Sequence, residues 1–342
     1  MKSGAKRFRS DIKKSIGLIM GLLLCGCSAG MIDDNGGLLK QNELSILTIG
    51  TADRGGTMYP VGEAIADVIS EVDNNMKVNV CASSGSADNV RALQYEEIDL
   101  GLVSGDIAYA AYYGEGEFQE NRAEELRAIA AVYPSLSNWM VPEDLEIIYV
   151  NQLVGKRIGV GPQESTTEAA AEVVFEVIGI DDNNAVIQNC GIGSGLEEMA
   201  EGNLDAVHGF AGIPIGSLLD YSKDHPSRLL EYQDEELQTI LDGNEFYYPD
   251  VIPAGTYVGQ KKDVRTFGTK CLLCVNASMD EELVYGLTRD LAACSEELGE
   301  KHEAMCSMTN DGFMFEELPI PLHPGAEKWY RENLDTGEYD GN

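Results

Sequence analysis

Basic side chains are scarce in this chain of 342 residues. It has 24 lysine and arginine residues against 58 aspartate and glutamate residues, which gives a formal net charge of −34 at pH 7. A surface of this sign repels the phosphates of nucleic acids, and no basic stripe in the sequence offsets it. We therefore expect no nucleic-acid partner.

Histidine is also scarce, and the four histidines are scattered along the chain. No two of them have the spacing that places two metal ligands on one face of a helix. The glycines around Ser194 match neither the nucleophile elbow of hydrolases nor the dinucleotide-binding fingerprint, and the sequence has no P-loop. We therefore expect a protein that is not an enzyme and that uses no cofactor and no metal.

Cysteine offers one partial metal motif, Cys271-Leu-Leu-Cys274. It lies in an apolar run that reads as a strand, where positions three apart point to opposite faces. No second cysteine or histidine pair accompanies it, so buried thiols are expected instead of a zinc site. The pairing of the six cysteines after residue 27 is left open.

Long apolar runs are missing too, apart from Ile16 to Leu24 behind a basic start. This run is too short for a permanent membrane span and has the length of a signal-peptide core. Its ending, Leu24-Cys25-Gly26-Cys27, resembles a bacterial lipobox, which implies cleavage after residue 26 and lipidation of Cys27. We expect an extracytoplasmic protein, periplasmic or held by lipid at the outer face of the cell membrane, with residues 27–43 as a tether.

The remaining sequence alternates short β-prone runs with amphipathic helices. This order predicts an α/β fold whose mainly parallel sheets are covered by helices on both faces. Strands are expected at 47–50, 77–81, 100–103 and 126–133, and the pattern then restarts with strands at 145–150, 157–160, 185–188 and 204–210. A return strand is expected at 270–275, followed by a helix around 283–291.

The length of the chain favours two lobes over one core. We predict a first lobe from residues 44–134 and 264–342 and a second lobe from residues 135–263. Two lobes joined by two chain crossings make a hinged cleft, and clefts of this kind are favoured ligand sites.

Small polar loops follow the predicted strands, at the edge of the sheet where such folds bind ligands. After the first strand, Gly55 and Gly56 allow backbone N–H groups to approach a guest, and a helix begins behind them at Pro60. The start of a helix favours negative charge, so these loops suit a small anion. The alternative for any one loop is an ordinary turn between a strand and a helix.

A series of short motifs resembles the solute receptors of TAXI-type TRAP transporters. They occur in that family's order, over roughly residues 46 to 332, as Ile49-Gly50-Thr51, Gly55 to Pro60, Ser83 to Asn89, Leu100 to Val103 with Asp106, Leu126 to Ala130, Tyr133-Pro134, Gly155 to Gly161, Leu204-Asp-Ala206 and Pro321 to Ala326. The resemblance implies a type II periplasmic-binding fold, a glutamate-like or dicarboxylate ligand, and a TRAP-type permease driven by an ion gradient as partner. The chain departs from the family's pattern at Asp53-Arg54, Met58, Ser104 and Pro162 to Glu164.

We predict that backbone N–H groups, hydroxyls and aromatic walls bind the carboxylate of this ligand. Arg54 could clamp it with two hydrogen bonds, or could instead be a solvated cation paired with Asp53. Asp205 could accept an ammonium group or cap a turn, and Ser165 could cap a helix through the spacing to Glu168. The full set of predicted ligand contacts is Arg54, Gly55, Gly56, Thr57, Met58, Tyr59, Ser84, Gly85, Ser86, Ser104, Tyr133, Ser165, Thr166, Thr167, Asp205 and Phe210.

The sequence thus predicts a monomeric receptor that captures a small organic anion or an amino acid and delivers it to a membrane permease. The alternative is the substrate-binding lipoprotein of an ATP-driven importer, which shares the two-lobed architecture. Ligand binding is expected to close the two lobes on each other.

Overall fold

The structure, a computed structural model, describes residues 44–334, and these residues belong to a single unit. The predicted signal peptide, the lipidation of Cys27 and the tether lie outside the described residues, as do residues 335–342. In residues 44–334, the helices are too short or too polar to cross a membrane.

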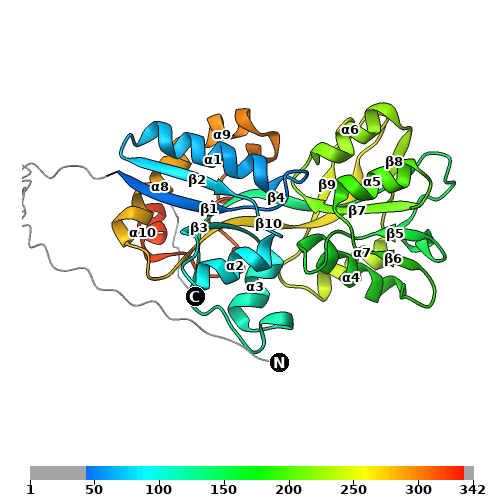
Figure 1. Ribbon diagram of the computed structural model, residues 1–342, viewed down its shortest axis with the longest axis horizontal. Helices are drawn as coiled ribbons and strands as arrows, with labels where there is room; N and C mark the ends of the chain where they lie inside the picture. The colour runs from blue at the N-terminus through cyan, green and yellow to red at the C-terminus, as the bar shows by residue number, and fades with distance from the viewer. Residues whose placement is uncertain (1–43, 335–342) are drawn as a thin grey trace, which may run out of the picture. The chain divides into compact units, whose positions relative to one another are not determined.

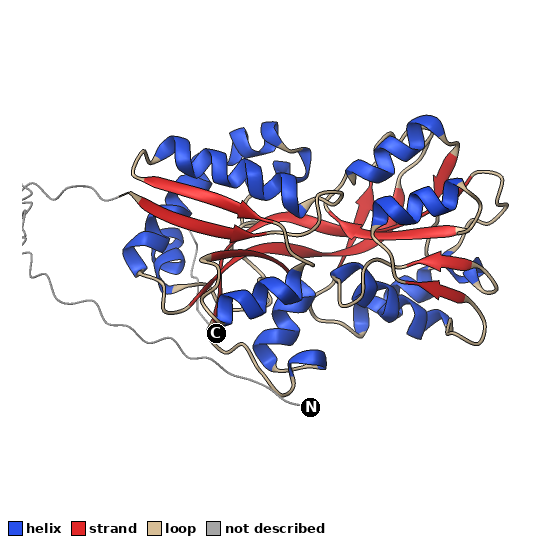
Figure 2. Cartoon of the chain, viewed as in Figure 1, coloured by secondary structure: helices blue, strands red, loops and turns tan. Residues whose placement is uncertain are grey.

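One ten-stranded sheet runs through the described part of the chain, in the order β2-β1-β3-β10-β4-β7-β5-β6, with β8 added beside β4 and β9 beside β10 (Figures 1 and 2). The strands are β1 (Ser45–Gly50), β2 (Met76–Cys81), β3 (Leu100–Ser104), β4 (Leu126–Pro142), β5 (Arg157–Gly159), β6 (Val186–Gln188), β7 (Ala206–Ala211), β8 (Ser227–Leu229), β9 (Tyr248–Ile252) and β10 (Val264–Asn276).

The sheet has two similar halves, which we call the first half (around β1, β2 and β3) and the second half (around β5, β6 and β7). Within each set the strands are parallel and in the same spatial order, β2-β1-β3 and β6-β5-β7. The long strands β4 and β10 run antiparallel to each other between the two sets. They are the two connections that join the halves (Figure 1).

Helices cover both faces of the sheet in each half. They are α1 (Met58–Val72), α2 (Ser86–Gln94), α3 (Gly105–Tyr113), α4 (Thr166–Ile178), α5 (Ile192–Ala200), α6 (Gly216–Asp224), α7 (Asp234–Asp242), α8 (Glu281–Ala293), α9 (Ser295–Lys301) and α10 (Pro324–Asn333), with short 3-10 turns η1 (Gly116–Phe118), η2 (Val150–Leu153) and η3 (Glu303–Thr309). Helix α1 shows why these helices pack on the sheet. Its Ile65, Val68 and Ile69 form a buried apolar stripe, while Glu63 and Asp67 on the other side are exposed.

The apolar core is divided between the two halves of the sheet. In the first half, one cluster packs under α1, α8 and α10 and another under α2 and α3. In the second half, one cluster packs under α4 and α7 and another under α5 and α6. The predicted two-lobed α/β fold is therefore confirmed, while its hinge motion and its lobe boundaries stay predictions. The boundary between residues 134 and 135 falls inside β4, and the one between 263 and 264 falls at the start of β10.

Two predictions about strands were wrong. Strand β4 does not end at Tyr133 but continues to Pro142, because its second part, from Leu136 onward, pairs with β7. Pro134 lies before that ladder, so its missing N–H leaves no bond to β7 unmade. The centre of the sheet is therefore antiparallel, and only the two outer sets are parallel.

Residues 145–150 do not form the predicted strand. Their apolar side chains include the buried Ile147 and Val150, but these secure a turn that leads into η2. The side-chain oxygen of Gln152 accepts hydrogen bonds from the backbone N–H groups of Ile148 and Tyr149, at 2.7 and 2.8 Å. The backbone donors that a strand would use are thus satisfied locally.

Candidate functional site

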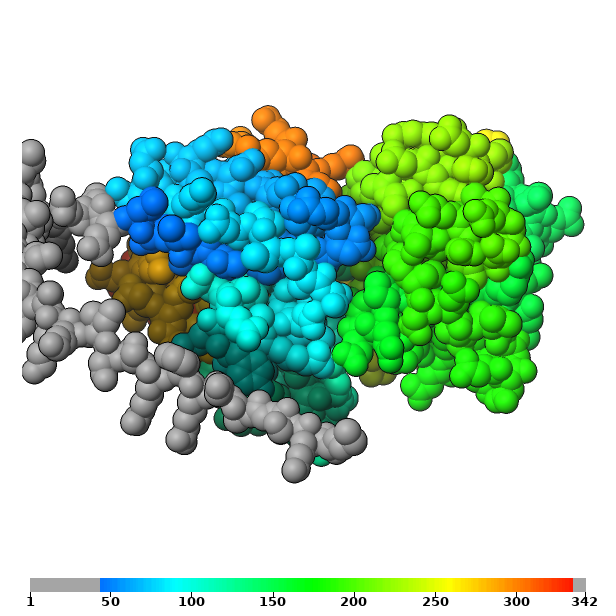
Figure 3. All heavy atoms as spheres, viewed as in Figure 1, coloured from blue at the N-terminus to red at the C-terminus, as the bar shows by residue number. Residues whose placement is uncertain are grey.

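A cavity of about 340 Å³ lies between the two halves, at the carboxyl ends of the parallel strands. Figure 3 shows the two halves meeting, with the first half in blue and cyan and, for its later residues, orange, and the second half in green. The volume is in the range of small-molecule sites. The cavity is lined by Ala52, Asp53, Gly56, Thr57, Met58, Ser83, Ser84, Gly85, Tyr133, Pro162, Ser165, Thr166, Thr167, Ile192, Phe210 and Ala211.

Four helices begin at this cavity, two from each half. Thr57, Gly85 and Ser165, which precede α1, α2 and α4, line the cavity, and so does Ile192, the first residue of α5. The first N–H groups of a helix have no partner within that helix. In the part of the chain that the structure describes, α1, α2 and α5 have no side-chain cap, so the N–H groups of their first turns, apart from Pro60, which has none, have no capping side chain.

Helix α4 differs because its first turn is capped. The Ser165 hydroxyl accepts a hydrogen bond from the Glu168 backbone N–H at 3.2 Å, as the spacing between these residues predicts. The cap occupies one donor of that turn, and the other N–H groups stay available. The four helix starts thus bring partial positive charges to the cavity, whose described lining has no basic side chain and one carboxylate, that of Asp53.

Hydrogen bonds join the two halves across the cavity. The hydroxyls of Ser86 and Thr166 lie 2.9 Å apart, and the Thr57 hydroxyl donates to the Gly212 carbonyl oxygen at 2.7 Å. These polar atoms are buried, so each bond contributes about 0.5–1.5 kcal/mol to holding the halves together. The structure therefore has the halves in contact around the cavity.

A buried chain of hydrogen bonds supports the cavity wall from behind. His208 Nδ1 lies 3.0 Å from the Thr167 carbonyl oxygen in the first turn of α4, and His208 Nε2 lies 2.9 Å from the Ser137 hydroxyl. The Ser137 hydroxyl also bonds the Tyr232 hydroxyl at 2.7 Å, which accepts from Trp139 Nε1. Burial lowers the pKa of His208 to about 3, so its imidazole is neutral at physiological pH. A neutral imidazole donates from one nitrogen and accepts at the other, which matches these partners.

The structure brings most of the predicted contacts together at the cavity. The predicted residues that line it are Gly56, Thr57, Met58, Ser84, Gly85, Tyr133, Ser165, Thr166, Thr167 and Phe210. Ser86 and Ser104 lie buried behind it, where the Ser104 backbone N–H donates to the Ser86 hydroxyl at 3.0 Å. Their contact with a ligand, like that of the lining residues, stays a prediction.

The loop that carries Arg54 is arranged differently from the clamp that the sequence suggests. The Arg54 guanidinium lies over the Tyr59 ring, 4.2 Å from its centroid, and Arg54, Gly55 and Tyr59 are not among the residues that line the cavity. Asp53 is the member of this loop that lines it, and its carboxylate accepts from the Gly55 N–H at 2.5 Å. The pairing of Arg54 with Asp53 is not formed in the described residues either, because Arg54 stacks on Tyr59 instead.

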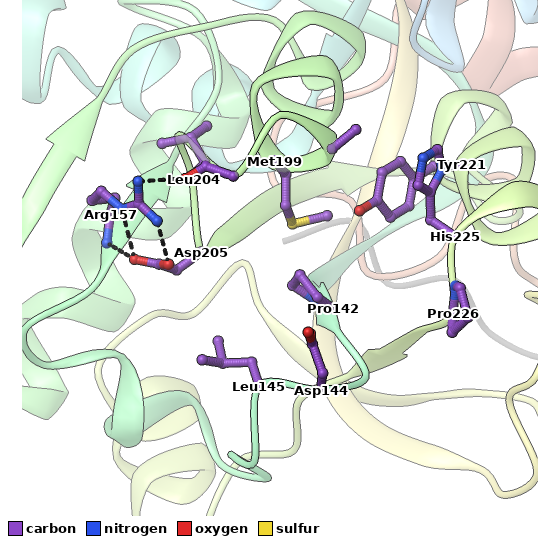
Figure 4. Close-up of a pocket in the computed structure, with 12 residues that line it drawn as sticks. Pro142, Asp144, Leu145, Arg157, Met199, Leu204, Asp205, Tyr221, His225 and Pro226 are labelled. Atoms are coloured by element: carbon purple, nitrogen blue, oxygen red, sulfur yellow. Dashed lines mark hydrogen bonds and ion pairs between the residues drawn. The ribbon is translucent and has the colours of Figure 1, made fainter.

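The structure places Asp205 apart from the other predicted contacts, at a different cavity. It precedes β7 at the amino end of that strand, and in a parallel sheet this edge lies opposite the carboxyl ends. Its carboxylate accepts from Arg157 Nε and Nη2 at 3.0 and 2.7 Å, and this bonding lowers the pKa of Asp205. Figure 4 shows the pair at one side of a second, more open cavity of about 600 Å³, across from stacked Tyr221 and His225.

Several residues of the cavity were missed from the sequence. They are Ala52, Asp53, Ser83, Pro162, Ile192 and Ala211. Asp53 had a usable signal, since it lies in the small-residue loop after β1 and departs from the resembled family's pattern. Ile192 begins the helix that follows β6 after a three-residue loop, which is the same arrangement that singled out the other loops.

The described residues contain no cluster of three or more histidine, cysteine, aspartate or glutamate side chains that could hold a metal ion. Cys271 and Cys274 are both buried, and they pack in different core clusters on opposite faces of β10, as the strand pattern predicts. Burial raises the pKa of the Cys271 thiol to about 12. Both thiols are therefore protonated and part of the core.

Fold and cavity together define a two-lobed α/β protein with a ligand-sized space between its lobes. The chain belongs to the NMT1-like family, whose model matches residues 49–333. It is also similar to the periplasmic aliphatic sulphonate binding protein of Escherichia coli, at 14% identity over 84% of this chain and 83% of that one, with a TM-score of 0.46.

Two further structures have the same degree of similarity. A putative L-cystine ABC transporter protein from Listeria monocytogenes is 13% identical over 76% of this chain and 95% of that one, with a TM-score of 0.47. An arginine transport system periplasmic binding protein from Legionella pneumophila is 13% identical over 76% of this chain and 99% of that one, with a TM-score of 0.46.

Proposed function

We propose that this protein is an extracytoplasmic receptor that captures a small organic acid or amino acid and delivers it to a membrane importer. The observation that carries the proposal is the cavity between the halves, onto which four helix N-termini open. Each helix start favours an anion by about 0.3–1 kcal/mol, and by more when it is partly buried. Convergence of several such starts can hold a carboxylate without an arginine.

The residues that line the cavity support a role in ligand binding without catalysis. The Thr57 hydroxyl bonds the Gly212 carbonyl oxygen, the Thr166 hydroxyl bonds that of Ser86, and the Ser165 hydroxyl caps α4. Among the described lining residues the one carboxylate, that of Asp53, accepts from the Gly55 N–H and is not hydrogen-bonded to any of these hydroxyls, so no nucleophile is paired with a base. We therefore propose a binding protein that is not an enzyme.

The class of the importer has two candidates. The motif resemblance implies a TRAP-type permease, whereas the three similar structures named above are binding proteins or components of other transport systems, one of them an ABC transporter by name. None of those three names a TRAP transporter. Neighbouring genes discriminate between the candidates: a TRAP-like permease supports the first, and an ATPase subunit supports an ATP-driven importer.

The lipid anchor is part of the same proposal and rests on the sequence Leu24-Cys25-Gly26-Cys27. Lipidation of Cys27 would hold the receptor at the membrane that contains its permease. Mass spectrometry of the protein purified from membranes tests this step. The expected result is an N-terminus at residue 27 with a mass increase on its cysteine, and an unmodified N-terminus would contradict it.

A thermal-shift screen of organic acids and amino acids tests the binding function. A ligand that binds only the folded protein at a hundred times its dissociation constant stabilises it by about 2.7 kcal/mol. We expect at least one small carboxylate to raise the melting temperature in a saturable way. If no organic acid or amino acid does so, the proposed function is wrong.

Two variants locate the binding. Ala211→Phe places a ring in the cavity between the halves and should abolish the shift, because Ala211 lines that cavity. The matched variant Asp205→Asn alters the second cavity, which contains Arg157, and should leave the shift unchanged. The opposite pattern would place the ligand at the Arg157 cavity and contradict the proposal.

A further inference from the structure

The charge around the cavity is unexpected for a receptor of a simple anion. Of the residues that line it in the described chain, Asp53 alone has a charged side chain, and neither lysine nor arginine is among them. Helix starts can neutralise one carboxylate, but a second carboxylate of the ligand would face Asp53 with no cation beside it. A dicarboxylate therefore fits the cavity poorly.

Asp53 is an exposed residue of the loop after β1, and it lines the cavity from the solvent side. One carboxylate oxygen accepts from the Gly55 N–H, which fixes the side chain in a short turn. The other oxygen faces the second half, where it lies 3.9 Å from the position that a Cβ on Gly191 would take. The carboxylate therefore reaches across the gap between the loop after β1 and the start of α5.

The remaining walls are largely apolar. Met58, Ile192 and Phe210 line the cavity together with Ala52 and Ala211, and Phe210 is buried. Such walls favour a hydrocarbon group, because burying it releases water from both surfaces. The cavity thus offers anion-binding helix starts, one anionic side chain and an apolar wall within one small volume.

We infer that the ligand is an α-amino acid with an apolar side chain, whose ammonium group binds Asp53. This inference rests on the proposed function and narrows its ligand class. The carboxylate of the amino acid takes the helix starts of α1, α2 and α4, and its side chain packs on Met58 and Phe210. Asp53 determines specificity by separating amino acids from other small acids.

Matched ligands test the role of the ammonium group. Leucine and 4-methyl-2-oxopentanoate have the same carbon skeleton and carboxylate, and only leucine has the ammonium group. Isothermal titration calorimetry of the purified protein, extended to valine, methionine and phenylalanine with their 2-oxo acids, should show the amino acids binding about 10- to 100-fold more tightly. Glutamate and succinate should bind more weakly than the best apolar amino acid.

The variant Asp53→Asn tests the residue. The amide oxygen of asparagine can still accept from the Gly55 N–H, so the turn is retained while the charge is lost. Affinity for the amino acid should fall about 10- to 100-fold, and affinity for its 2-oxo acid should stay the same or rise. Asp73→Asn is a matched control, because Asp73 makes the same kind of turn with the Asn75 N–H at 2.9 Å but lies at the far end of α1.

The outcomes separate the inference from the proposed function. Tight binding of a 2-oxo acid or a dicarboxylate, with amino acids equal or weaker, would keep the receptor function and overturn the inference. So would an Asp53→Asn variant that binds the amino acid within twofold of the original protein. If neither kind of acid binds, the proposed function itself fails and the inference fails with it.

Discussion

The buried His208 links the stability of the protein to pH. Its pKa is about 3 in the folded protein against an ordinary value of 6.5, because burial disfavours the charged imidazolium. Between these two values the unfolded chain binds a proton and the folded protein does not. The stability associated with His208 is therefore complete above pH 6.5 and is lost as the pH falls, by about 1.4 kcal/mol per pH unit.

The variant His208→Gln removes this proton uptake. Between pH 7 and pH 5 the original protein should lose about 2 kcal/mol more free energy of unfolding than the variant does. Urea unfolding at the two pH values measures the difference. His225→Gln, at an exposed histidine stacked on Tyr221, should keep the original pH dependence. Equal losses in the original protein and the His208 variant would contradict the account.

The sequence was enough to predict those cavity residues whose position follows from the direction of the chain, at the end of a strand or the start of a helix. Thr57, Ser84 and Thr166 come after strands or open helices, and such residues gather at one edge of a parallel sheet. Asp205 was grouped with these residues, but it precedes its strand and so lies at the other edge. The sequence could not show that Asp53, and not Arg54, lines the cavity. Neighbouring loop residues point in different directions, and only the folded loop determines which one faces the cavity.

The long strands β4 and β10 are the elements that hold the halves together, and they approach each other closely at Gly268. A Cβ at this residue would lie 2.4 Å from the Ser135 carbonyl oxygen and 2.5 Å from Leu136 Cδ2. No real Cβ contact is this short, so the two strands would have to move apart. Gly268 therefore permits the pairing of the two connections between the halves.

We predict that Gly268→Ala lowers the free energy of unfolding by about 1–3 kcal/mol through this overpacking. Chemical denaturation measures the change. The matched variant Gly286→Ala lies in α8, where an added Cβ meets no atom within 4 Å, and it should be neutral or stabilising by up to about 1 kcal/mol. A Gly268 variant as stable as the Gly286 variant would show that the strands tolerate separation.

Helices with a clear apolar stripe, such as α1 and α8, could be predicted to within a few residues. The extent of β4 could not, because Pro134 is typical of a strand end and only its place before the β7 ladder makes it tolerable. Residues 145–150 are rich in β-branched and aromatic side chains, as a strand is, and the composition gives no sign of the hydrogen bonds to Gln152 that turn the chain there.

For the described molecule as a whole, the repeat of strands and helices was enough to predict two α/β halves, since each half repeats one strand order. It was not enough to predict one continuous sheet through both halves. That continuity depends on antiparallel pairing between β4 and β10, which are more than a hundred residues apart in the chain. Local patterns do not encode pairing at such separation.

The continuous sheet also places the cavity. Because β4 and β10 run through both halves, the helix starts of α1 and α2 face those of α4 and α5 across a narrow space. The chain has a net charge of −34, which repels an anionic ligand. Binding of an acid therefore depends on the local backbone donors of the cavity. The electropositive groups are the helix ends themselves.

A crystal structure of the protein with the tightest-binding acid from the screen tests this account most directly. The account predicts that the carboxylate lies at the first turns of α1, α2 and α4, within hydrogen-bond distance of their backbone N–H groups. A ligand held by Arg157 in the second cavity, or one that makes no contact with these helix starts, would contradict it.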